Sequence, residues 1–292
     1  MASADVHETF WDGVQGAIES SPRDAFELLK SYMELVLARH DFADGSRYID
    51  AALDLLRTVF GLDDANVQAM YEEHILCCNA VAMQSLSQGQ SEDALRLLTT
   101  ADQHTASDGP LYANVATRKR LRAITLNNFA CYAKKHGQLH AAIQYLEKTL
   151  ALESASSGAK AENPAGTHLN ICAILSAMGR HLRAADHARC AVELLSHERG
   201  GRLEDKTTPD SLLAIAYFNY GAELEHQKKY DLAATTYAKG YDVARAELDS
   251  NHALVHALLQ ARTDAQDKVA ARKGYSSPRG ASAALVVSPR RK

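Results

Sequence analysis

Apolar residues recur at helical spacing on both sides of Gly137, between Thr125 and Leu152. The two stripes consist of Leu126, Phe129, Ala130 and Ala133 before the glycine, and Ala142, Leu146 and Thr149 after it. This spacing predicts two amphipathic helices joined by a short turn. Because such a hairpin cannot bury both apolar faces alone, it needs neighbours of its own kind.

The same pattern occurs three more times along the chain. The turns fall at positions 89, 137, 179 and 228, which are 48, 42 and 49 residues apart. Small residues recur where the two helices of each hairpin face each other, for example Ala142 and Gly221. The sequence therefore predicts an all-α chain built from stacked helical hairpins.

The order of large and small residues in these hairpins resembles the tetratricopeptide repeat (TPR). The segment TLNNFACYAKKHGQLHAAIQYLEKTLALE in particular resembles repeats of the kinesin light chain type. The resemblance covers residues 70–248 and is strongest at 125–152 and 217–241, although these units are longer than the usual repeat of about 34 residues. It implies a right-handed α-solenoid of TPR-like hairpins with terminal capping helices, and a non-enzymatic protein-binding role.

The periodicity divides the chain into five segments. They are an N-terminal capping helix (1–22), a divergent first hairpin (23–62), TPR-like repeats (63–249), a C-terminal solvating helix (250–272) and a disordered basic tail (273–292). The tail has no periodicity and no acidic residue, which is typical of disorder.

Several helix boundaries follow from turn and capping residues. We expect a turn at 40–45 before a helix over 46–60, and an N-cap at Asp64 for a helix that continues to Leu86. The helix before Gly137 is expected to begin near Leu111, and the last helix to cover 251–272.

Composition supports a helical, intracellular protein. The 292 residues are 46% hydrophobic and include only 6 prolines, and the net charge of −4 argues against nucleic acid as the main partner. No apolar run is long enough for a transmembrane helix, and the N-terminus does not resemble a secretory signal. We read the five cysteines as free thiols in a reducing compartment. The expected location is the cytoplasm, with association with the cytoskeleton as an extension of that reading.

Asn128, Asn170 and Asn219 occupy the same position in three successive repeats. An Asn amide offers a donor and an acceptor, which match one peptide unit, and the resemblance implies that these residues hold an extended peptide by its backbone. In the preceding repeat Ala80 takes this position and Asn79 comes one residue earlier, so the row is expected to begin at Asn128. The alternative is that the amides are solvated or brace the neighbouring loop.

Other residues are expected beside this row in a concave groove. They are Asn127, Cys131, Lys134, Lys135, Phe218 and Ala222. The lysines, extended by a basic run over 118–122, would favour acidic segments of a partner; the alternative for the run is a solvated helix face. Phe218 is a candidate wall for an apolar ligand side chain, or it packs against the next helix.

The sequence contains no recognisable catalytic, cofactor or metal motif. His252 and His256 are four residues apart, but no Glu stands between them as a zinc hydrolase requires. His136 and His140 lack a nearby third ligand, and the consecutive Cys77 and Cys78 diverge around a helix. We therefore predict a protein that is not an enzyme and uses neither a cofactor nor a metal.

Ser277 and Ser288 each precede a proline in the basic tail, so they resemble proline-directed phosphorylation sites. The function that the sequence favours is an adaptor that binds an extended peptide segment of a partner protein in its groove. The alternative is a structural subunit of a larger cytoskeletal or ciliary, microtubule-associated assembly. Neither interpretation involves nucleic acid or insertion into a membrane.

Overall fold

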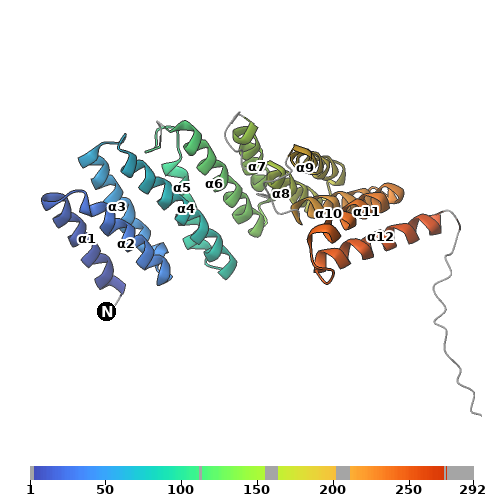
Figure 1. Ribbon diagram of the computed structural model, residues 1–292, viewed down its shortest axis with the longest axis horizontal. Helices are drawn as coiled ribbons and strands as arrows, with labels where there is room; N and C mark the ends of the chain where they lie inside the picture. The colour runs from blue at the N-terminus through green and yellow to red at the C-terminus, as the bar shows by residue number, and fades with distance from the viewer. Residues whose placement is uncertain (1–2, 112–113, 155–163, 202–210, 273, 275–292) are drawn as a thin grey trace, which may run out of the picture. The chain divides into compact units, whose positions relative to one another are not determined.

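The computed structural model describes residues 3–111, 114–154, 164–201, 211–272 and 274. These residues form twelve α-helices and no strand (Figure 1). They belong to two compact units, Met1–Thr167 and His168–Lys292, and each unit is treated separately below. The candidate phosphorylation sites Ser277 and Ser288, and the rest of the predicted tail except Gly274, lie outside the described residues.

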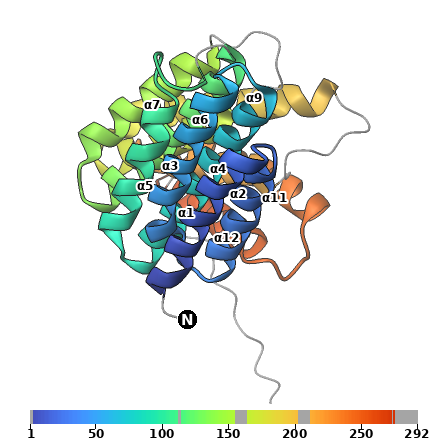
Figure 2. The ribbon, with the colours of Figure 1, turned by 90° about the vertical axis from the view of Figure 1, so that its left-hand side faces the viewer.

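The first unit contains seven complete helices. They are α1 (Ser3–Ser20), α2 (Asp24–Ala38), α3 (Phe42–Phe60), α4 (Ala65–Gln88), α5 (Ser91–His104), α6 (Val115–Lys135) and α7 (Leu139–Ser154). Each helix contacts the next one in the chain, and α4 also contacts α6, as α3 contacts α5. The helices follow one another in chain order (Figure 1), and Figure 2 views this unit from its α1 end. Within this unit, hairpins therefore nest against hairpins, as the repeat pattern predicts.

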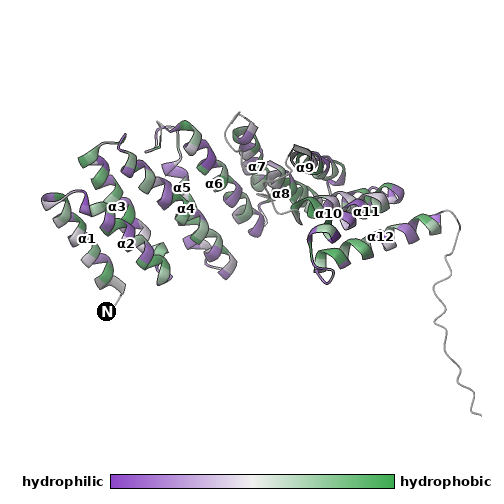
Figure 3. Ribbon diagram, in the orientation of Figure 1, coloured by the Kyte–Doolittle hydropathy of each residue, from purple (hydrophilic) through white to green (hydrophobic). Residues whose placement is uncertain are grey.

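One hydrophobic core runs from α1 to α6 of the first unit. Its largest fully buried side chains are Tyr71, Phe42, Leu29, Met33, Ile49, Leu53, Leu56, Ile75, Leu97, Leu98, Leu111 and Leu121. Each helix carries both apolar and polar residues (Figure 3), which allows one face to pack while the other meets water. The α2–α3 pair, which the sequence predicts to be a divergent hairpin, belongs to this core.

Five hairpin turns share one backbone geometry. His40, Gly89, Gly137, Gly179 and Lys228 all have a positive φ, between 57° and 87°. At each turn the next residue donates its N–H to a carbonyl five positions back, as in the 2.9 Å bond from the Gln90 N–H to the Ser85 carbonyl. This is the Schellman motif, in which a left-handed residue ends the helix. The motif occurs at all four predicted turns and also between α2 and α3.

Two helices in the first unit begin at residues other than those expected. Helix α3 begins at Phe42 instead of residue 46, because Phe42 is buried and continues the apolar stripe of the helix. Helix α6 begins at Val115 instead of near Leu111, because the Asn114 side chain caps it by accepting the Thr117 N–H at 3.1 Å. The expected cap at Asp64 is confirmed, since its carboxylate accepts the N–H groups of Asn66 and Val67.

The second unit contains most of α8 (Pro164–Ala177), and all of α9 (His181–Gly201), α10 (Ser211–His226), α11 (Tyr230–Glu247) and α12 (Ala253–Arg272). Helix α10 contacts α9, α11 and α12. Gly221 and Gly240 permit close crossings here: a Cβ at Gly221 would lie 2.5 Å from the Tyr237 ring, and one at Gly240 would lie 2.8 Å from Tyr217. Helix α12 begins two residues later than expected and buries Val255, Leu258 and Ala265 against this core.

Candidate functional site

A chain of hydrogen bonds connects α4 to α6 in the first unit. Asn79 is buried, and its Nδ2 donates to the Ile75 carbonyl at 2.9 Å and to the Thr125 hydroxyl at 3.0 Å. Asn128, half-buried on α6, donates its Nδ2 to the Oδ1 of Asn79 at 2.9 Å. An amide has two N–H groups and a carbonyl oxygen, so this single bond orients the Asn128 side chain and still leaves it capacity for a ligand.

Four members of the predicted basic surface contact their own chain. Their partners are the Ala106 carbonyl for Arg118 (3.2 Å), Glu72 for Arg120, Asp102 for Arg122 (3.2 Å) and the Leu86 carbonyl for Lys135. Glu72 and Leu86 lie on α4, and Asp102 lies on α5. These contacts favour a structural role for most of the basic run. The Glu72 and Asp102 carboxylates offset the charges of Arg120 and Arg122, and backbone carbonyls accept hydrogen bonds from Arg118 and Lys135. Lys134 is exposed.

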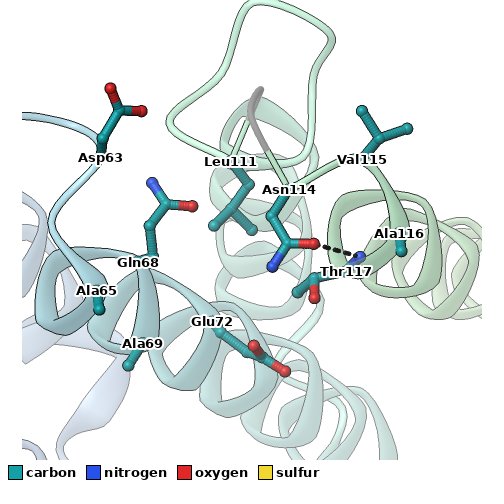
Figure 4. Close-up of a pocket in the computed structure, with 10 residues that line it drawn as sticks. All are labelled: Asp63, Ala65, Gln68, Ala69, Glu72, Leu111, Asn114, Val115, Ala116 and Thr117. Carbon is teal, nitrogen blue, oxygen red and sulfur yellow. Dashed lines mark hydrogen bonds between the residues drawn. The ribbon is translucent and has the colours of Figure 1, made fainter.

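An open pocket of ≈ 690 Å³ lies where α4 and α6 begin. Gln68, Leu111 and Asn114 lie next to one another in it (Figure 4). The Nε2 of Gln68 donates to the carbonyls of Leu62 (2.7 Å) and Pro110 (2.8 Å). The Oε1 of Gln68 is buried without a donor among the described residues. A buried acceptor that lacks a partner costs about 1–3 kcal/mol. Because this atom is itself buried, a donor from a ligand would reach it only when the Gln68 side chain moves toward the pocket.

The other predicted groove residues are distributed over both units. Asn127 and Cys131 are half-buried on α6 in the first unit, and Asn170, Asn219 and Ala222 are half-buried in the second. Asn128, Asn170 and Asn219 each lie nine residues before a left-handed turn residue, so the position repeats in both units.

Phe218 packs against the α10–α12 core, with its ring centroid 5.8 Å from that of Tyr237. This contact favours the packing interpretation of Phe218 that the sequence left open.

Four of the five thiols, those with a raised pKa, are unsuited to nucleophilic chemistry. All five cysteines are free, and Cys78 and Cys172 are buried. Burial, with the nearby Glu223 carboxylate, raises the pKa of Cys172 to about 12, and burial also raises the pKa of Cys131. A protonated thiol is a weak nucleophile, so Cys131 would meet a ligand as a small apolar side chain.

Asp50, His74 and His104 form a cluster in the first unit that no pattern in the sequence indicates. The Oδ1 of Asp50 lies 2.9 Å from the Nε2 of His74 and 2.7 Å from the Nε2 of His104. Burial alone would raise the pKa of Asp50, but the hydrogen bonds from both histidines hold that pKa well below its usual range. The three residues belong to α3, α4 and α5. No local motif joins them, so only the packing of the hairpins brings them together.

A second pair of histidines lies in the second unit. The Nδ1 atoms of His168 on α8 and His187 on α9 are 3.0 Å apart. Burial, together with His168 and Arg183, lowers the pKa of His187 to about 4, and burial lowers the pKa of His168. One ring N–H donates to the nitrogen of the other ring, and the lowered pKa values favour the neutral form of both imidazoles.

Comparison with known proteins identifies the fold. No family model matches the sequence, and no curated protein is similar to it. Among solved structures, nearly identical TPR-like repeats from Podosopora anserina, described as those of a kinesin light chain, match with a TM-score of 0.53 and 14% identity. That match covers 70% of this chain and 90% of the other. BtubC (BKLC) from P. vanneervenii matches with a TM-score of 0.50 and 14% identity over 98% of this chain and 97% of the other.

The chain therefore has a TPR-like repeat fold, which confirms the fold class and the resemblance expected from the sequence. Within the described residues, no helix is both long and apolar enough to cross a membrane.

Proposed function

We propose that this protein is a non-enzymatic adaptor that binds an extended segment of a partner protein across α4 and α6 of the first unit. The observation that carries the proposal is the pocket at the start of these helices, whose wall contains Gln68 with its buried, unpartnered Oε1. A TPR-like fold supports the proposal, because stacked hairpins present extended binding surfaces.

Gln68 and Asn128 are the residues that we assign to the peptide backbone. Gln68 offers an acceptor once its side chain turns toward the pocket, and Asn128 offers both a donor and an acceptor. Asn79, the partner of Asn128 on α4, is 11 residues after Gln68, which is about 16 Å along a helix. About five residues of extended chain cover that distance. Because Asn79 already orients Asn128, less side-chain entropy is lost when a ligand binds.

The proposal includes no preference for acidic partners. Arg118, Arg120, Arg122 and Lys135 already contact groups of this chain. Val115, which is exposed, instead offers an apolar contact in the pocket. We infer that the ligand is recognised by its backbone and by one or two apolar side chains. Asn170 and Asn219 would act in the same way on the second unit.

The test is a peptide-display selection against the full-length protein, followed by affinity measurements with the selected peptide. Asn128→Ala and Gln68→Met should each weaken binding at least about 10-fold, since each removes a hydrogen-bonding group in a partly desolvated site. Gln144→Ala is the matched control, because Gln144 is exposed on α7 away from the pocket lining. Thermal melts should show that Asn128→Ala and Gln68→Met remain folded.

Equal affinity of wild type and both site variants would refute the proposal. A partner that copurifies stoichiometrically, and whose binding neither variant changes, would favour the alternative of a structural subunit in a larger assembly.

A further inference from the structure

We propose that Asp50, His74 and His104 form a binding site for a divalent transition-metal ion, and that Zn²⁺ is the ion this set of ligands suits. Two imidazoles and one carboxylate are ligand types that zinc accepts. The three ligand atoms all lie within 4.8 Å of one another.

The distances are close to those of a metal centre. In a tetrahedral zinc site with bonds of 2.0–2.2 Å, ligand atoms are about 3.3–3.5 Å apart. The Oδ1 of Asp50 is 2.9 Å from one Nε2 and 2.7 Å from the other. Small rotations of the side chains therefore make room for an ion between them. Both histidines direct Nε2 at the same carboxylate oxygen, so their lone pairs converge when Nε2 is deprotonated.

The surroundings suit a bound ion with one open position. The His74 side chain is 0% exposed, whereas the side chains of His104 and Asp50 are 17% and 31% exposed. The Phe42 ring lies 5.8 Å from that of His74, and the Tyr71 ring lies 5.2 Å from that of His104. The buried side is therefore aromatic. The partly exposed side gives an entry path and a place for water as a fourth ligand.

Cys78 is near the cluster but is not among the proposed ligands. Its Sγ is 3.7 Å from the Nε2 and 3.9 Å from the Nδ1 of His74. Nearly equal distances to the two ring nitrogens place the sulfur beside the ring instead of in front of Nε2.

The alternative explanation of the cluster is a metal-free hydrogen-bond network, in which Asp50 accepts from an N–H of each histidine.

A bound ion would connect three helices from two successive hairpins. Asp50 belongs to α3, His74 to α4 and His104 to the last turn of α5. An ion that binds only the folded state stabilises that state as its concentration rises above Kd. Metal binding would therefore stabilise the first unit by joining these three helices. This inference does not depend on the proposed peptide site.

The experiment titrates chelator-treated full-length protein with ZnCl₂ by calorimetry, and follows unfolding through Trp11. This residue is the only tryptophan in the sequence and lies on α1, so its fluorescence reports the first unit. We expect one zinc ion per chain and a rise in Tm of about 5–10 °C at a hundredfold excess of zinc over Kd. Replacement of Zn²⁺ by Co²⁺ should produce the visible absorption of a four-coordinate site.

Asp50→Asn and His104→Gln should each weaken zinc binding by more than about 100-fold, because loss of a mere outer-shell partner already costs 10–100-fold. Both residues are partly exposed, so both variants should fold. His140→Gln replaces an exposed histidine on α7 and should bind zinc like wild type. Wild type that takes up no zinc would overturn the proposal, as would zinc binding that Asp50→Asn and His104→Gln leave unchanged.

Discussion

The close crossing of α10 and α11 at Gly221 can be tested by adding a single methyl group. In Gly221→Ala, the new Cβ would lie 2.5, 2.7 and 2.8 Å from the Cε1, Cδ1 and Cζ atoms of Tyr237. Real Cβ atoms do not approach other atoms so closely. Three ring atoms are involved and Tyr237 is only 2% exposed, so the whole ring must move within a packed core.

The expected magnitude combines two opposing effects. Overpacking a core costs about 1–3 kcal/mol, whereas Gly to Ala within a helix gains about 1 kcal/mol. The net destabilisation of Gly221→Ala should therefore be up to about 2 kcal/mol. Gly16→Ala on α1 is the matched control, because nothing lies within 4 Å of the Cβ that it adds. The difference between the two variants removes the propensity term and leaves the cost of packing.

Urea unfolding followed by far-UV circular dichroism measures both variants, and Trp11 fluorescence separates the first unit from the second. Tyr237→Leu provides a further check, since removal of the ring should abolish the cost of Gly221→Ala in the double variant. If Gly221→Ala stabilised the protein as much as Gly16→Ala does, the close crossing would be wrong, and with it the register of this hairpin.

Three further predictions concern single side chains. Lys228→Gly should stabilise the protein by up to about 1 kcal/mol in urea unfolding, because Lys228 has a φ of 60°, which glycine adopts without strain. Stability should fall as pH falls from about 6.5 towards 4, because burial lowers the folded-state pKa of His187 to about 4 from 6.5, so the unfolded state binds more protons there; His187→Gln should flatten this part of the pH profile. Cys78 and Cys172 are buried, so a thiol reagent should label both of them only after unfolding.

Each of these predictions has a contradicting result. Loss of stability in Lys228→Gly would mean that the lysine side chain, not the backbone strain, dominates at this turn. An unchanged pH profile in His187→Gln would assign the acid sensitivity to other groups. Rapid labelling of Cys78 or Cys172 in native protein would show that the surrounding helices open readily.

Local sequence patterns predict the helical hairpins. The helix starts and side-chain partners that they do not predict depend on contacts between residues far apart in the chain. Gly89, Gly137 and Gly179 could be read directly as turns, because a left-handed residue favours glycine. The start of α6 was misplaced because Leu111 continues the apolar pattern, although it is buried outside the helix and Asn114 provides the cap. Apolar spacing alone cannot distinguish a helical residue from a buried loop residue.

The side-chain contacts of the candidate site are even harder to predict from local sequence patterns. The sequence displays the positive charge of Arg120, but not that Glu72, 48 positions earlier, lies on the helix against which it packs. The cluster of Asp50, His74 and His104 likewise depends on the packing of three helices. Which acid or imidazole faces which partner is set by the register between hairpins, and no local pattern records that register.

Asn79 shows why stacking and the proposed binding cannot be separated in this protein. Its amide connects α4 to Thr125 and Asn128 on α6, and it is buried, so a shift in register would leave polar groups unpaired at a cost of about 1–3 kcal/mol. The same bonds fix the orientation of Asn128. A substitution at Asn79 should therefore weaken both stability and peptide affinity. Asn128→Ala leaves the Asn79 Oδ1 without its donor and so should also cost stability, but less than loss of the Asn79 amide, which makes three bonds. Only a comparison of the two variants in both assays can separate a ligand-binding amide from one that holds the repeats together.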